Sequence, residues 1–141
     1  MVRLNVRVNS PRPDFRTFLH LAYGIEANVD TDGDAKPVYT REWTSLYMRL
    51  REDGAKPVSA EAVDGDWWAV ESDDAALAEV VALYLFEVCG AAIERDGHPV
   101  APETIAAARE AHARALKRAQ GSPWHRSCED DPYCDRWGAA T

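Results

Sequence analysis

The chain has 141 residues, of which 46% are hydrophobic and 28% charged, a composition typical of one globular domain. Its net charge of -8 at pH 7 makes direct binding of nucleic acid unexpected, because phosphates repel an acidic chain. No apolar segment approaches the roughly 20 residues that cross a membrane. Residues 1–5 lack the apolar core of a signal peptide. We therefore expect a cytoplasmic protein.

The first third of the chain predicts a strand, a helix and a loop. Apolar and polar residues alternate over residues 2–8, which predicts a strand with one polar face. A proline follows, and apolar residues then recur at helical spacing up to Gly24, which predicts a helix over residues 13–23. The acidic stretch 30–34 is predicted to be a loop. It resembles the start of a calcium-binding loop, but Arg41 occupies the position of the bidentate glutamate, so no calcium site is expected.

The middle of the chain predicts short strands around one long helix. Residues 38–51 are rich in β-forming side chains and alternate in polarity towards their end, whereas residues 55–64 look irregular. An Asp-Gly turn precedes a short strand over residues 67–71. A serine N-cap followed by two aspartates predicts a helix over residues 72–89, and a further strand is predicted over residues 91–95.

A last helix is predicted over residues 103–120, because Pro102 opens it and Gly121 ends it. The element order is strand, helix, strand, strand, helix, strand, followed by the extra helix. The first six elements follow the order of a ferredoxin-like split β-α-β sandwich. We therefore predict an α+β fold with a four-stranded antiparallel sheet, two helices on one face, an extra C-terminal helix and an irregular tail. Residues 1–121 would form a single domain, and the tail 122–141 would pack on it.

Two of the predicted helices raise a question about what covers them. His112 lies in the middle of the apolar stripe of the last helix. It could be a core histidine that is hydrogen-bonded to a backbone carbonyl or to a tail residue, or it could be a metal ligand or a catalytic base. The helix over residues 72–89 is apolar on both sides. Its second side carries Leu83 and Phe86, which either the C-terminal helix and tail or another chain must cover.

The familiar catalytic motifs are absent from the sequence. It has no phosphate-binding glycine loop, no dinucleotide fingerprint, no nucleophile elbow and no zinc-protease motif. No cofactor is therefore expected. If the protein is an enzyme, the candidate residues are His20, on the polar side of the first helix, together with His112 and Tyr47.

The nearest approach to a metal motif is in the tail. His125, Cys128 and Cys134 could bind zinc with His112 or Cys89 as the fourth ligand. The spacing matches no standard zinc motif, so we predict no metal site. A disulfide between the two tail cysteines and two free thiols are the alternatives. An odd number of cysteines, three, favours free thiols in a reducing compartment.

The aromatic residues predict a binding surface. Trp43 and Tyr47 are expected on the outward face of their strand. Trp67 and Trp68 are adjacent and must point to opposite faces of the sheet. One face of a two-layer sandwich is open, and an open face that carries tryptophan, tyrosine and arginine has the composition of a binding surface. A loop, the tail or a second copy in a homodimer could instead cover it.

The negative charge is concentrated beside these aromatic residues. Residues 52–74 carry a net charge of -7 and residues 75–96 carry -3. We therefore predict an acidic, aromatic surface that binds a basic protein. The predicted contact residues are Trp43, Tyr47, Asp64, Asp66, Trp67, Trp68, Asp73 and Asp74.

About a third of the chain resembles a known class of proteins. The string from Trp67 to Asp74, the helix with Leu77 and Tyr84, and the segment 90–93 resemble small cytosolic immunity proteins of bacterial polymorphic toxin systems. The resemblance implies a non-enzymatic protein that binds and occludes a cognate toxin. The alternative is a small enzyme on a dimeric ferredoxin-like sandwich with an apolar substrate pocket, for example in secondary metabolism.

Overall fold

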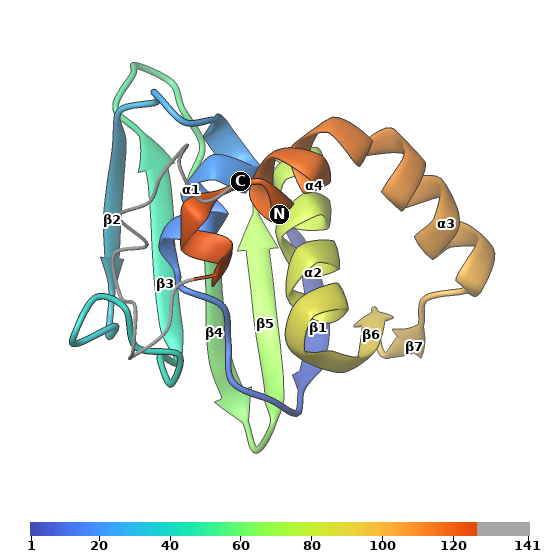
Figure 1. Cartoon of the computed structure of the whole chain (residues 1–141). Coiled ribbons are helices and arrows are strands. Elements are labelled where there is room, and N and C mark those ends of the chain that lie inside the picture. Colours follow the sequence, from blue (N-terminus) through green and yellow to red (C-terminus); the bar gives the residue numbers. More distant parts are fainter. Residues whose placement is uncertain (127–141) are drawn as a thin grey trace.

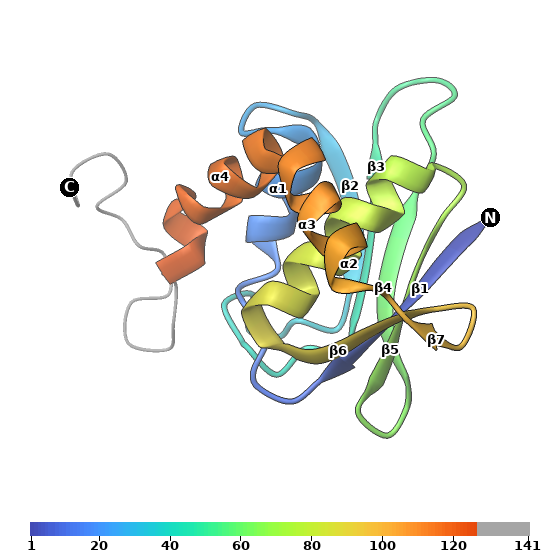
Figure 2. The same cartoon turned by 90° about the vertical axis from the view of Figure 1, so that its right-hand side faces the viewer.

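The computed structural model describes residues 1–126, which form a mixed α+β fold (Figure 1). Viewed from the side, the helices lie on one side of the twisted sheet (Figure 2). In chain order the elements are β1 (Val2–Val8), α1 (Arg16–Tyr23), β2 (Val29–Gly33), β3 (Ser45–Leu50), β4 (Val58–Asp64), β5 (Trp67–Ser72), α2 (Ala75–Cys89), β6 (Gly90–Arg95), β7 (His98–Pro99), α3 (Pro102–Ala111), α4 (Ala113–Gln120) and the 3₁₀ turn η1 (Pro123–Arg126).

The sheet has seven strands in the order β2-β3-β4-β5-β1-β6-β7, and every neighbouring pair is antiparallel. Strands β2 to β5 form a meander, and β1 inserts between β5 and β6. Helix α2 packs directly on β1, β5 and β6. The predicted α+β class is therefore confirmed, but the sheet has more strands than the four predicted.

The additional strands are β2, β4 and the two-residue β7. The prediction of a loop over residues 30–34 is wrong, because β2 pairs with β3 along its whole length. The prediction of irregular structure over residues 55–64 is also wrong, because β4 pairs with both β3 and β5. Aspartate and alanine have low intrinsic β propensity, and here pairing with neighbouring strands outweighs it.

The last helix is broken into two. His112 has φ of -107° and ψ of 18°, so α3 ends there and α4 begins in a new direction. The prediction of one continuous helix over residues 103–120 is therefore wrong. The break allows α4 to pack on α1, where the Arg118 guanidinium donates to the carbonyl oxygens of His20 and Leu21.

The C-terminal helices α3 and α4 cover the second side of α2. Of the two alternatives, coverage by the C-terminal part of the same chain is the one observed. Leu83 is buried where Ile105 and Ala108 of α3 approach it. Phe86 remains half-buried beside Leu116 of α4.

The core is aromatic at its centre and lies between the sheet and the helices. The Trp43 ring meets Phe18 at 5.7 Å and Trp68 at 5.4 Å between centroids, both edge to face. The Trp43 Nε1 donates to the carbonyl of Pro13 over 2.8 Å. The prediction that Trp43 faces outward is wrong, because it precedes β3 and its side chain is only 1% exposed.

Residues 122–126 pack on the helices rather than on the sheet. The Arg16 guanidinium lies 3.9 Å from the centroid of the Trp124 ring, a cation–π contact. The His125 Nδ1 lies 2.7 Å from the Tyr84 hydroxyl. The rest of the predicted tail, including Cys128 and Cys134, lies outside the described residues. Within the described part of the chain, none of the helices has the length and apolar character needed to cross a bilayer.

Candidate functional site

One face of the sheet carries no helix in the part of the chain that the structure describes (Figure 2). Side chains alternate along each strand, so the residues between the buried ones project from this side. In β3, for example, Leu46 and Met48 are buried and Tyr47 is 38% exposed. We call this surface the open face. It comprises Asp30, Asp32, Tyr47, Arg49, Ser59, Glu61, Trp67, Glu71, Arg3, Asn5, Arg7 and Glu94.

A continuous row of side chains crosses five strands of the open face. Tyr47 lies directly between Asp32 of β2 and Ser59 of β4. Ser59 lies opposite Glu71 of β5, and Glu71 lies opposite Arg3 of β1. Because neighbouring strands are about 4.8 Å apart, this row is about 19 Å long. It presents an aromatic ring, a hydroxyl and both signs of charge in one line.

The open face is mixed in charge, with an excess of negative groups. It carries five carboxylates and three guanidinium groups, so negative charges exceed positive charges by two. Asp64 at the end of β4 and Asp66 in the turn before β5 add two carboxylates at one end. Arg7 Nε donates to Asp66 over 2.9 Å, and this hydrogen bond holds the pKa of Asp66 below its usual value.

The two adjacent tryptophans point to opposite sides, as predicted. Trp67 is half-buried on the open face, opposite Arg7 of β1 and Asp64 of β4. Trp68 is 3% exposed and belongs to the core. The prediction that Trp43 and Trp68 contact a partner is therefore wrong, because neither indole reaches the surface.

The structure does not gather the predicted acidic contacts into one cluster. Asp64 and Asp66 lie at the start of β5, whereas Asp73 and Asp74 follow its end, about 20 Å away for a six-residue strand. Asp73 lies 3.6 Å from the amino terminus. Asp74 caps α2 and accepts from the Leu77 amide over 3.1 Å. Partner contact by these four residues, Tyr47 and Trp67 stays a prediction.

The three candidate catalytic residues lie apart. The prediction that His20 lies on a polar helix face is wrong, because it is 7% exposed with its Nδ1 2.8 Å from the Ser122 hydroxyl. Burial and the positive charge of Arg118 lower the pKa of His20. His112 Nε2 lies 2.9 Å from the Glu79 carboxylate. Tyr47 is on the opposite side of the sheet, so the three residues share no site.

The metal and thiol candidates give no reactive centre in the described part of the chain. No group of three or more histidine, cysteine, aspartate or glutamate side chains within residues 1–126 could hold a metal ion. Cys89 is buried, and its thiol donates to the Leu85 carbonyl over 3.3 Å. Burial raises the pKa of Cys89 to about 11, so this thiol stays protonated at neutral pH.

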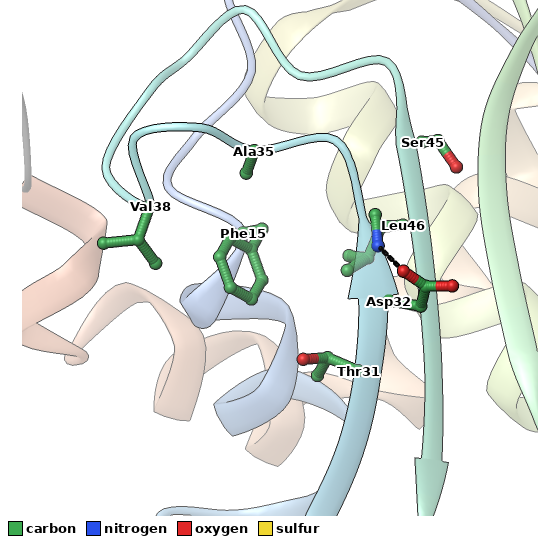
Figure 3. Close-up of a pocket in the computed structure, with 8 residues that line it drawn as sticks. Phe15, Thr31, Asp32, Ala35, Val38, Ser45 and Leu46 are labelled. Carbon is green, nitrogen blue, oxygen red and sulfur yellow. Dashed lines mark hydrogen bonds between the residues drawn. The ribbon is translucent and has the colours of Figure 1, made fainter.

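A small pocket lies at the β2 edge of the sheet and was not predicted (Figure 3). Its volume is about 210 Å³. The chain segments that meet there are the start of α1, the end of β2, the loop before β3 and β3 itself. Its lining residues are Phe15, Thr31, Asp32, Gly33, Ala35, Val38, Ser45 and Leu46.

The Asp34 side chain fixes the loop above this pocket. Its carboxylate accepts from the amides of Thr44 over 2.8 Å and Ser45 over 3.0 Å, and also from the Thr44 hydroxyl. Partial desolvation alone would raise the pKa of Asp34, but these hydrogen bonds outweigh it and lower the pKa. These hydrogen bonds therefore join the two ends of the loop between β2 and β3.

Comparison with known proteins adds no assignment. No protein-family model, curated protein or solved structure matches the chain. The open face and the edge pocket are therefore interpreted from their geometry and chemistry.

Proposed function

We propose that the protein is a non-enzymatic binding protein of the immunity or inhibitor type, and that its open face covers a basic partner protein. The observation that supports this most is the row through Tyr47 on a sheet face that no described helix covers. Tyrosine, tryptophan and arginine are the residues most enriched at the energetic centres of protein interfaces, and the open face carries all three.

The charge of the molecule supports a basic partner. A net charge of -8 attracts a basic protein over a distance of about one Debye length, roughly 8–10 Å at physiological salt. Such steering raises the association rate more than it tightens the complex. The arginines of the open face would then pair with a smaller number of acidic groups on the partner and fix its orientation.

The rigidity of the open face also supports a binding role. The residues of the Tyr47 row sit on strands that are hydrogen-bonded on both sides, except for β2 at the edge. Their backbones are therefore already ordered before a partner arrives, which lowers the entropy cost of association.

We also propose a relation to the ferredoxin-like arrangement for the centre of the fold. Strands β4, β5, β1 and β6 with helices α1 and α2 follow the split β-α-β pattern, with β1 between the two strands that α2 connects. Strands β2 and β3 would then be a hairpin added at one side and β7 a strand added at the other. Such an added hairpin extends the open face by two strands.

Loss of the two aromatic side chains of the open face tests the proposed function. The protein is co-expressed with the product of each neighbouring gene, and complex formation and protection from toxicity are measured. The double variant Tyr47→Ala, Trp67→Ala should weaken the complex by about 10- to 100-fold, as expected for interface aromatic residues.

The variant Glu110→Ala, on the exposed surface of α3, is the matched control and should bind like the wild type. Circular dichroism and thermal unfolding check that the double variant stays folded. A folded double variant that binds its partner as tightly as the wild type would refute the proposed function.

A further inference from the structure

The outer edge of β2 has backbone groups that point away from the sheet. Arg51 N donates to Asn28 O and Asp34 N donates to Ser45 O, so the even-numbered residues of this strand form the hydrogen-bonded pairs with β3. In an antiparallel pair the intervening residues direct their N–H and C=O groups to the other side. Val29, Thr31 and Gly33 therefore present these groups at an edge with which no strand within residues 1–126 pairs. Of these amides, Gly33 N donates to its neighbour Asp32 Oδ1 over 2.9 Å.

The pocket shown in Figure 3 opens beside this edge. Thr31 and Gly33 contribute to its lining from β2, and Phe15, Val38 and Leu46 make it apolar. Its volume of about 210 Å³ suits one aliphatic or aromatic side chain. The pocket is thus placed to receive a side chain from a strand that lies along β2.

A second, more open depression connects the edge with the open face. Asp32, Gly33 and Ser45 line both hollows, and Tyr47 lines only the second. A segment seated along β2 would therefore also reach the Tyr47 end of the open face. The edge and the face form one continuous surface.

The side chains of β2 specify which segment would fit. Asp30 and Asp32 project to the open face, whereas Val29 and Thr31 project to the helix side. Residues 26–34 carry a net charge of -4 and no basic residue. Asp30 is already paired with Arg51, and Asp32 is exposed at the edge. An added strand would meet carboxylates on one side and an apolar pocket on the other.

We propose that β2 accepts an extended segment of the partner as an additional strand, in which basic residues alternate with apolar ones. The basic side chains lie beside Asp30 and Asp32, and one apolar side chain enters the pocket. Backbone hydrogen bonds to Val29, to Thr31 and to the carbonyl oxygen of Gly33 hold the segment in place, the recognition mode known as β-augmentation. This inference rests on the proposed binding function and identifies the segment of the partner that is recognised.

A second copy of the chain is a poorer occupant of the same edge. Pairing of β2 with β2 of another copy about a two-fold axis would bring Asp30 and Asp32 of one copy opposite the same residues of the other. Like charges directly opposite each other destabilise a strand pair. The net charge of -8 on each copy adds to the repulsion.

A synthetic peptide tests the inference on the full chain without knowledge of the partner. The probe is a nine-residue peptide in which arginine alternates with valine, titrated into ¹⁵N-labelled protein. Saturable shifts are expected at the amides of Val29, Thr31 and Gly33. A peptide with N-methyl groups on the edge-facing amides should bind about tenfold or more weakly, because it loses those hydrogen bonds while the protein is unchanged. A peptide with glutamate in place of arginine should bind as weakly as the N-methylated peptide, because its carboxylates are repelled by Asp30 and Asp32.

Two variants test the edge and the pocket separately. Thr31→Pro removes an outward amide without removing a ladder hydrogen bond, and should abolish the shifts, whereas Thr31→Ala should retain them. Val38→Phe fills the pocket and should weaken binding even if the proline variant fails to fold. The inference would be overturned if the N-methylated peptide or the glutamate peptide bound as tightly as the unmodified arginine peptide. It would also be overturned if the arginine peptide showed no saturable binding.

The outcomes separate this inference from the proposed function. Glu110→Ala, on the exposed surface of α3, lies outside the open face and the edge and should leave peptide binding unchanged. If the peptide fails while the partner still requires Tyr47 and Trp67, only the strand addition is wrong. If the peptide binds but the partner is indifferent to the open face, the proposed function is wrong. Dimerisation of the chain that Thr31→Pro abolishes would assign the edge to a second copy instead.

Discussion

At the scale of single residues, the same side-chain type has different roles on the two sides of the sheet. Trp67 and Trp68 are neighbours in sequence, and their opposite orientation could be predicted from strand geometry alone. The burial of Trp43 could not, because it depends on Pro13 and Phe18, which lie in a distant part of the chain. The burial of His20 could not be predicted either, since it depends on Arg118 of α4 and on Ser122, which follows that helix.

The burial of His20 predicts a pH dependence of stability. Its folded-state pKa is lower than the ordinary value of about 6.5, so the unfolded chain binds a proton at higher pH than the folded one. The free energy of unfolding should therefore fall as the pH decreases from about 7 towards 5. Urea unfolding of the wild type and of His20→Asn over this range measures the effect.

His20→Asn keeps a polar atom near the position of Nδ1 but does not titrate, so its stability should change less with pH than that of the wild type. His98→Asn, at an exposed position of β7, is the matched control and should keep the wild-type pH dependence. If the free energy of unfolding of His20→Asn fell with decreasing pH as much as that of the wild type, His20 would not be the source of the pH dependence.

At the scale of elements, periodicity predicted those parts whose burial pattern is visible locally. The strand over residues 2–8 and the helix ending near Cys89 agree with β1 and α2 within a few residues. In β2, polar and less polar residues also alternate with a period of two, which was a signal for a strand. The three aspartates obscured it, since aspartate is typical of turns. The break at His112 has no comparable local signal.

The junction between α2 and β6 predicts that Gly90 tolerates no side chain. A Cβ atom there would lie 2.7 Å from Phe86 Cα and 3.0 Å from Val6 Cγ1. With φ of -103°, the backbone itself suits any residue, so the obstacle is steric. Gly90→Ala should lower the free energy of unfolding by about 1–3 kcal/mol.

Gly121 offers the matched control at the end of α4. A Cβ atom there would be 3.4 Å from its nearest neighbour, Lys117 O, and φ is -84°. Gly121→Ala should be neutral or stabilising by about 0.5 kcal/mol, because it restricts the unfolded chain. Thermal and urea unfolding compare the two variants, and equal stability would contradict the close approach of β6 to α2.

At the scale of the whole molecule, the two sides of the sheet differ in the residues that they carry. The helix side holds the aromatic core and buries His20 and Cys89, so its titratable groups serve the fold. The open face holds Tyr47 and Trp67 among charged residues, and the edge pocket continues it. The outward direction of Tyr47 could be predicted from the sequence, whereas for the adjacent pair Trp67 and Trp68 only their opposite orientation could be predicted. The pocket could not, because Phe15, Thr31, Val38 and Leu46 meet only after the loop before β3 has folded.

Hydroxyl-radical footprinting of the protein, alone and with its captured partner, tests the central proposal most directly. Tyr47 and Trp67 should be labelled in the free protein and protected in the complex. Phe86 and Trp124, which are half-buried on the helix side, should be labelled equally in both states. Protection of Phe86 and Trp124 with unchanged labelling of Tyr47 and Trp67 would place the partner on the helices and contradict the proposal.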